Sequence, residues 1–184
     1  VQTCALPICT ITDPSSVISE TRTYTANGLM ASIKDARNFL TQFSFDGFDR
    51  PNKTTYQDTT FEQNSSYDPN GNVLTYVTRS GSTIVNTFDV LNRLSTKAPS
   101  GQPTVTNTYD LAGRLTQTSK PVVAGDPSSG AIQLFYDTAG RFFKEQYPDG
   151  KTVTHVLDAN GNITKTTYPD SYFVDRAYDQ LNRL

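Results

Sequence analysis

The segment Tyr109–Leu115 reads YDLAGRL, and Tyr136–Phe142 repeats it as YDTAGRF. Six further segments share the pattern of an aromatic or large apolar residue first, an aspartate second in all but one of them, and a turn-forming residue fifth. The first residues of the eight segments, here called the anchors, are Tyr24, Phe45, Tyr67, Phe88, Tyr109, Tyr136, Leu157 and Tyr178. Their spacings are 21, 22, 21, 21, 27, 21 and 21 residues, which establishes an internal repeat of about 21 residues.

Each segment has the residue types of a tight turn. The second position is aspartate in all copies except the first, which has Thr25, and aspartate at the start of a turn accepts a bond from the backbone two residues on. These aspartates are Asp46, Asp68, Asp89, Asp110, Asp137, Asp158 and Asp179. The fifth position carries Gly28, Asp49, Gly71, Asn92, Gly113, Gly140, Gly161 or Asn182. Glycine, asparagine and aspartate tolerate a positive φ, so we expect that backbone conformation at every copy.

A second turn follows each anchor after about twelve residues. It reads PDG at Pro148–Gly150 and PDS at Pro169–Ser171, with looser versions at Arg79–Gly81 and Pro99–Gly101. Each repeat is therefore predicted to be strand, turn, strand, turn. Four residues before each of the last five anchors lies Ile84, Val105, Ile132, Val153 or Val174, on the same strand face as the anchor, whereas the first three copies carry Glu20, Thr41 and Gln63 there. The opposite face is rich in threonine, as at Thr104, Thr106 and Thr108.

Composition agrees with an all-β chain. Of the 184 residues, 35% are hydrophobic, which is low for a globular domain, while 27 are threonine and 20 are phenylalanine or tyrosine. We therefore expect repetitive antiparallel hairpins with a thin or one-sided core. The 16 basic and 18 acidic residues leave no basic surface for nucleic acid. No apolar run is long enough to span a bilayer, and no signal peptide is visible.

Enzyme signals are weak, and we predict no catalytic residue, no cofactor and no metal site. His155 is the single histidine and falls on a predicted strand, where a polar or half-buried structural role is the simpler interpretation. The aspartates recur at turn starts, which favours structure over catalysis. The DANGN stretch at 158–162 lacks the glycine position and the glutamate of a calcium loop. An enzyme whose active site lies outside this sequence is a third and weaker possibility.

A column of arginines at the sixth position allows two interpretations. It comprises Arg50, Arg93, Arg114, Arg141 and Arg183. A row of arginines can hold an acidic cargo or a glycan. Each arginine also follows an aspartate by four residues, so pairing within the turn is simpler, although an exposed pair contributes about 1 kcal/mol at most. We favour the structural interpretation.

The first residues do not follow the repeat. The segment Val1–Ile8, VQTCALPI, resembles the translation of a widely used short-read sequencing adapter, and we interpret residues 1–9 as adapter and junction. Residues 10–184 are then the repeat array, about eight repeats truncated at both ends. Cys4 and Cys9 consequently say nothing about a redox compartment.

The repeats resemble a known family. YDLAGRL and YDTAGRF, together with YPDG at Tyr147–Gly150, resemble the YD repeat of Rhs proteins, whose relatives include the insecticidal toxin-complex shells and the teneurins. The resemblance covers about residues 20–184. Thr25, Pro51 and Leu157 depart from the pattern, so we expect the first copies to pair less regularly.

This resemblance implies a fold and a role. In that family, YD repeats form a curved, spiralling β-sheet that closes into a shell around a polymorphic C-terminal toxin. This chain would be a piece of shell wall, and its partners would be the remainder of the shell and the enclosed toxin. The family also implies a secreted or cell-surface location. The alternative function is a cell-surface adhesion or carbohydrate-binding repeat, because aromatic side chains bind sugars in many proteins.

Overall fold

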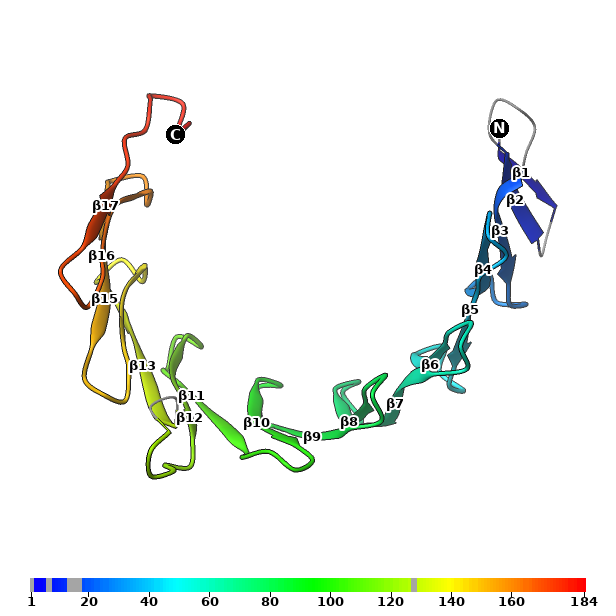
Figure 1. Ribbon diagram of the computed structural model, residues 1–184, viewed down its shortest axis with the longest axis horizontal. Helices are drawn as coiled ribbons and strands as arrows, with labels where there is room; N and C mark the ends of the chain where they lie inside the picture. The colour runs from blue at the N-terminus through cyan, green and yellow to red at the C-terminus, as the bar shows by residue number, and fades with distance from the viewer. Residues whose placement is uncertain (1, 6–7, 13–17, 127–128) are drawn as a thin grey trace. The chain divides into compact units, whose positions relative to one another are not determined.

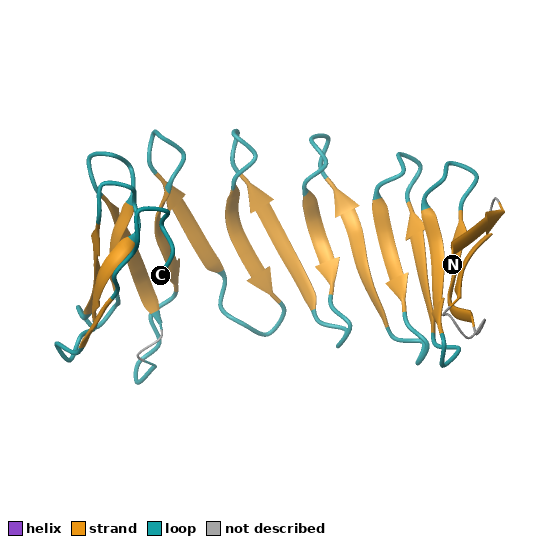
Figure 2. Cartoon of the chain, turned by 90° about the horizontal axis from the view of Figure 1, so that it is seen from above, coloured by secondary structure: helices purple, strands orange, loops and turns teal. Residues whose placement is uncertain are grey.

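The computed structural model describes residues 2–5, 8–12, 18–126 and 129–184. Every element in these ranges is a β-strand (Figure 1). The chain divides into an N-terminal unit, Val1–Asn92, and a C-terminal unit, Arg93–Leu184. Within each unit the strands lie side by side and the turns lie at the two ends of the strands (Figure 2).

The N-terminal unit is an antiparallel meander in which each described strand pairs with the next along the chain. Its strands are β1 (Gln2–Ala5), β2 (Ile8–Thr12), β3 (Ile18–Tyr24), β4 (Met30–Asp35), β5 (Leu40–Phe45), β6 (Pro51–Thr55), β7 (Phe61–Tyr67), β8 (Val73–Val77) and β9 (Thr83–Phe88). The regular pairing includes the early repeats. Pro51, which departs from the repeat pattern, pairs with Phe45 at the start of β6.

The C-terminal unit has the same topology. Its strands are β10 (Leu94–Pro99), β11 (Val105–Tyr109), β12 (Leu115–Lys120), β13 (Gly130–Tyr136), β14 (Phe142–Gln146), β15 (Thr152–Leu157), β16 (Ile163–Thr167) and β17 (Phe173–Asp175). The prediction of an all-β chain built from repetitive antiparallel hairpins is therefore confirmed.

The anchors mark the ends of strands. Seven of the eight anchors are the last residue of a strand, and the residue six positions later begins the next one. Tyr109 pairs with Leu115 and Tyr136 with Phe142, each directly after a shift of register. The eighth anchor differs: β17 ends at Asp175, and the second strand of that hairpin would begin at Leu184, the last residue of the sequence.

The positive φ predicted at the fifth turn position is present in all eight copies, from 59° at Asn182 to 91° at Gly161. The second turns have it as well, at Gly150 and at Ser171. The second turns of the first two repeats have a positive φ too, at Asn38 and at the β-branched Thr59; the sequence analysis named no residues for these two turns, because they lack the Pro-Asp-Gly pattern. In the hairpin of β11 and β12, Thr108 pairs with Gln117 and Tyr109 with Leu115, so Thr116 is the extra residue that makes the register shift.

The core is as thin as the composition predicts. Among the described residues, the buried apolar side chains are Cys9 and Val153. In β11, Val105, Asn107 and Tyr109 are half-buried, while Thr106 and Thr108 on the opposite face are exposed. The two-faced pattern predicted from sequence is therefore present, although the anchor face is half-buried and not enclosed.

Two irregular segments interrupt the array. The loop Pro121–Gly130 accounts for the 27-residue interval; its residues 127–128 lie outside the described residues, and the buried Ser129 hydroxyl donates to the carbonyls of Val123 and Asp126. The predicted adapter segment, residues 1–9, lies partly outside the described residues. Its origin stays a prediction.

A glycine substitution tests the turn conformation. We expect Gly71→Ala to lower the free energy of unfolding by about 1 kcal/mol, because alanine is strained at a φ of +87°. The matched control is Gly47→Ala, since Gly47 has no positive φ and a Cβ meets nothing within 4 Å at either glycine. Urea unfolding of the two variants measures the difference. Equal stabilities of the two variants would contradict the proposed turn.

Candidate functional site: the turn ladder

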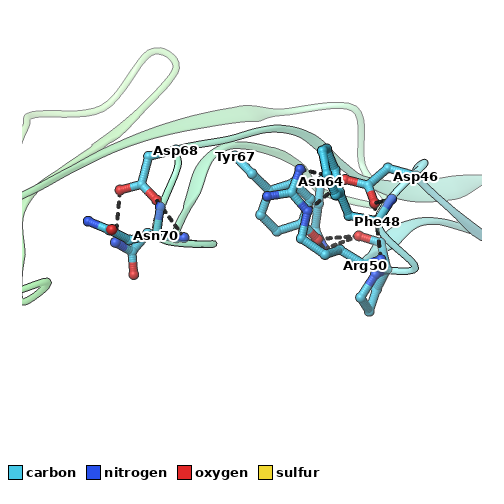
Figure 3. A network of polar contacts seen from close by, with 9 residues as sticks. Asp46, Phe48, Arg50, Asn64, Tyr67, Asp68 and Asn70 are labelled. Carbon is cyan, nitrogen blue, oxygen red and sulfur yellow. Dashed lines mark hydrogen bonds and ion pairs between the residues drawn. The ribbon is translucent and has the colours of Figure 1, made fainter.

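Within each unit, the turns that follow the anchors lie in a row at one end of the strands. This row is here called the turn ladder. In each turn the aspartate carboxylate organises the backbone. Asp110 Oδ1 accepts hydrogen bonds from the backbone N–H groups of Ala112 and Arg114, both at 2.9 Å. Asp46 Oδ1 accepts the equivalent bonds from Phe48 and Arg50 at 2.9 and 3.0 Å (Figure 3). The predicted role of the aspartates is therefore confirmed, and a second backbone bond is added to it.

The second carboxylate oxygen binds the side chain at the sixth position. Ion pairs of 2.6–2.8 Å join Asp46–Arg50, Asp110–Arg114, Asp137–Arg141 and Asp179–Arg183. In the two copies with asparagine, Asn72 Nδ2 and Asn162 Nδ2 donate to Asp68 and Asp158 at 2.8 and 2.9 Å. Pairing inside the turn, predicted for the arginines, is present in these copies. The exceptional first copy uses Thr25, whose hydroxyl oxygen accepts from the Leu29 N–H at 3.1 Å.

These bonds lower the pKa of the turn aspartates. The Arg50 side chain is the main cause at Asp46, and the Asn72 and Asn162 side chains are the main causes at Asp68 and Asp158. For Asp110, Asp137 and Asp179 the largest cause of the lowered pKa is the backbone N–H of the arginine. Carboxylates held ionised by turn contacts suit structure, whereas a general acid needs a raised pKa.

The arginines also reach the next repeat. The guanidinium carbon of Arg50 lies 4.2 Å from the centre of the Tyr67 ring, that of Arg93 lies 4.4 Å from Tyr109, and that of Arg114 lies 4.7 Å from Tyr136. A cation over an aromatic face contributes about 0.5–1 kcal/mol at exposed sites. Each of these three arginines thus joins its own turn to the anchor of the following copy, a contact that the sequence analysis did not identify.

Tyrosine anchors form a second link between copies. The Tyr109 hydroxyl donates to the Leu94 carbonyl and the Tyr136 hydroxyl donates to the Leu115 carbonyl, both at 2.9 Å. Tyr67 donates in the same way to the carbonyl of Pro51. In every case the acceptor is the seventh residue of the preceding repeat. The sequence analysis did not identify this hydrogen bond, although the preference for tyrosine over phenylalanine at the anchors is a sequence signal from which it could have been predicted.

Asparagines complete the ladder. Asn70 Nδ2 and Asn72 Nδ2 both donate to Asn92 Oδ1 of the next turn, at 2.8 and 2.9 Å. Asn160 and Asn162 repeat this arrangement with Asn182 at 3.1 and 2.8 Å. Side chains from the fourth to sixth positions therefore connect neighbouring turns where no arginine does so.

The remaining candidate residue, His155, lies on β15 away from the ladder. Its Nδ1 is 3.1 Å from the Thr166 hydroxyl, and its ring packs 5.6 Å from the Phe142 ring. The predicted half-buried strand position is correct. Within the described residues there is no cluster of three or more histidine, cysteine, aspartate or glutamate side chains able to hold a metal ion. The same residues contain no helix of the length and hydropathy needed to cross a membrane.

Comparison with known proteins gives matches in structure alone. No family model matches the sequence, and no curated protein matches it. The fold matches a Tc holotoxin pore of Photorhabdus luminescens that carries a TccC3 mutation, with a TM-score of 0.66 and 16% identity over 84% of this chain and 9% of that one.

Two TcdB2–TccC3 structures match over 97% of this chain and 12% of theirs. The structure with Cdc42 has a TM-score of 0.72, and the one without the hypervariable C-terminal region has a TM-score of 0.71, both at 14% identity. The chain thus spans about a tenth of the length of these neighbours. Its fold is that of the Rhs-like repeat shell of Tc toxins, which confirms the predicted resemblance at the level of fold.

Removal of one anchor hydroxyl tests the link between repeats. We expect Tyr109→Phe to lower the free energy of unfolding by about 1 kcal/mol, because the Leu94 carbonyl loses a half-buried donor. Tyr172→Phe is the matched control, since that ring is 62% exposed and no hydroxyl contact is found for it among the described residues. Thermal unfolding compares the two variants. A larger loss in Tyr172→Phe would contradict the link.

Proposed function

We propose that this chain is a non-enzymatic wall segment of a larger Rhs-like shell, and that the shell encloses and delivers a toxin located C-terminal to the repeats. The observation that carries the proposal is the match over 97% of this chain to TcdB2–TccC3, at a TM-score of 0.72. One of those neighbouring proteins has a hypervariable C-terminal region. A chain that covers 12% of such a neighbour has the size of a segment of its wall.

The contacts of the ladder support a scaffold role. Each repeat is held to the next by contacts that recur along the chain: a guanidinium on a tyrosine ring, a tyrosine hydroxyl on a carbonyl, and asparagine on asparagine. Such nearest-neighbour contacts let a sheet extend to any number of repeats. The functional groups of the turns are used in these contacts, which leaves the turn aspartates and arginines little capacity for catalysis.

The proposal includes partners and a location. The immediate partners are further repeats of the same protein, since an antiparallel sheet one layer thick needs neighbours at its edges. The second partner is the enclosed toxin. A shell that delivers a toxin acts outside the cell that makes it, so we infer a secreted or cell-surface location for the parent protein.

The test uses the parent protein that contains this segment. We expect the polypeptide C-terminal to the repeats to resist trypsin in the native protein, because a closed wall excludes the protease. Deletion of residues 138–157, one residue short of a whole repeat, is expected to disrupt the strands that follow and open the wall, and so to raise the cleavage rate of that polypeptide at least tenfold. A substitution at the exposed turn tip, Leu111→Ser, is the control and leaves protection unchanged.

Two results would contradict the proposal. One is a C-terminal polypeptide that trypsin cleaves equally fast before and after the deletion. The other is a parent protein with no polypeptide after its repeats.

A further inference from the structure

Three turns of the turn ladder contain the dipeptide Asn-Gly, at Asn27–Gly28, Asn70–Gly71 and Asn160–Gly161. The three asparagines are exposed, and the three glycines have a φ of 80° to 91°. In this dipeptide the backbone nitrogen of glycine can attack the side-chain carbonyl carbon of asparagine, because glycine has no Cβ to obstruct the approach. The three turns are therefore candidate sites of spontaneous deamidation.

The reaction requires the turn to open. In each folded turn the glycine N–H donates to the carbonyl three residues back, at 3.0 Å for Gly28 and Gly71 and at 3.2 Å for Gly161. This bond must break before the nitrogen can lose its proton and bond to the asparagine Cγ. The side-chain amide then leaves as ammonia, which closes a succinimide ring, and water opens the ring at either carbonyl to give aspartate or isoaspartate. The rate therefore follows the fraction of time that the turn is open.

An aspartate holds two of these turns closed around the asparagine. Asp68 Oδ1 accepts from the backbone N–H of Asn70 at 2.9 Å (Figure 3) and from that of Asn72 at 2.8 Å. Its second oxygen accepts from Asn72 Nδ2 at 2.8 Å. Asp158 makes the same three bonds in its own turn, each at 2.9 Å. The backbone on both sides of Asn70 is thus tied to one carboxylate.

The first turn is held by fewer side-chain bonds. Thr25 stands in place of the aspartate, and within the described residues its hydroxyl accepts one bond, from the Leu29 N–H at 3.1 Å. The bond to the N–H of the asparagine itself, which Asp68 makes, has no counterpart at Asn27 in the described structure. The turn around Asn27 is therefore expected to open more often than the other two.

The contact of Asn27 with the next turn also differs from its counterparts. Asn27 Nδ2 donates to both carboxylate oxygens of Asp49, at 2.9 and 3.0 Å. Asn70 Nδ2 donates instead to the amide oxygen of Asn92 at 2.8 Å. An amide can turn over and donate its NH₂ group to a new carboxylate, whereas an ionised carboxylate can only accept. Deamidation of Asn27 therefore removes the link and brings two like charges together, while the same change at Asn70 leaves a bond to Asn92 available.

We propose that Asn27 is a site of self-modification, at which spontaneous deamidation breaks the contact between the first two turns of the ladder. Its turn is the least restrained of the three, and its aspartate product repels Asp49. Water is the only co-reactant, and ammonia is the only product released. This site is independent of the toxin-enclosing role.

Peptide mapping by mass spectrometry tests the site on the native 184-residue chain, incubated at mildly alkaline pH. We expect Asn27 to be converted about fivefold faster than Asn70 and Asn160, which is the factor that one hydrogen bond in a turn supplies. In concentrated urea the three rates are expected to converge, because all three turns are open and each asparagine precedes a glycine. The urea sample therefore separates the effect of the fold from the effect of neighbouring residues.

Reciprocal substitutions test the cause. Thr25→Asp supplies the missing carboxylate and is expected to slow the conversion of Asn27 to the rate of Asn70. Asp68→Thr is the reverse change and is expected to raise the rate at Asn70 about fivefold. Asn160 in the same chain is the control, since its rate stays unchanged unless the whole chain unfolds.

The product is tested separately. Asn27→Asp reproduces the aspartate form and is expected to lower the midpoint of urea unfolding. Asn70→Asp is the matched control and is expected to lower it less, because Asn92 can donate to the new carboxylate.

The proposal is overturned if Asn27 is converted no faster than Asn70 in the native chain, or if its excess rate persists in urea. It is also overturned if Thr25→Asp leaves the rate at Asn27 unchanged, or if Asn27→Asp shifts the unfolding midpoint no more than Asn70→Asp. None of these results affects the trypsin-protection test of the wall.

Discussion

The structure depends on a carboxylate that holds a five-residue turn closed. One aspartate oxygen accepts two backbone N–H groups, and the other binds the arginine or asparagine four residues on. The turn therefore has a fixed length and a fixed positive-φ residue. Because the same turn and the same register shift recur at successive anchors, the register of these hairpins is set locally. The chain needs no large core to choose its strand pairing.

Because each turn fixes the pairing of its own two strands, the sheet forms with few buried side chains. A sheet with one layer buries few side chains, and the described part of this chain buries two apolar ones. The remaining order comes from contacts between successive repeats, in which Arg114 lies over the Tyr136 ring and the Tyr136 hydroxyl reaches the Leu115 carbonyl. Anchor, arginine and seventh residue act together across a repeat boundary, so the pattern YDxxGRL describes a connection as well as a turn. Because each contact joins neighbouring repeats only, a sheet of this kind can be extended by any number of repeats.

Much of the fold could be predicted from the sequence, because the residues that determine each hairpin lie close together along the chain. The interval between anchors predicted the hairpins, and the glycine and asparagine at the fifth position predicted the positive φ. The links between repeats were not predicted, because they depend on which side chains two strands apart lie close together. A second turn was predicted in every repeat, but a positive φ was not predicted at Asn38 or Thr59, because these two turns lack the Pro-Asp-Gly pattern and β-branched threonine disfavours a positive φ.

The central claim is that the 21-residue repeat is the unit of structure. The most direct measurement compares two internal deletions by far-UV circular dichroism and urea unfolding: residues 137–157, one whole repeat, and residues 138–157, one residue fewer. The account predicts that the 21-residue deletion keeps the β spectrum and a cooperative transition, because each remaining anchor still meets the seventh residue of the copy before it. It predicts that the 20-residue deletion loses both for the strands that follow. Equal behaviour of the two chains would contradict the account.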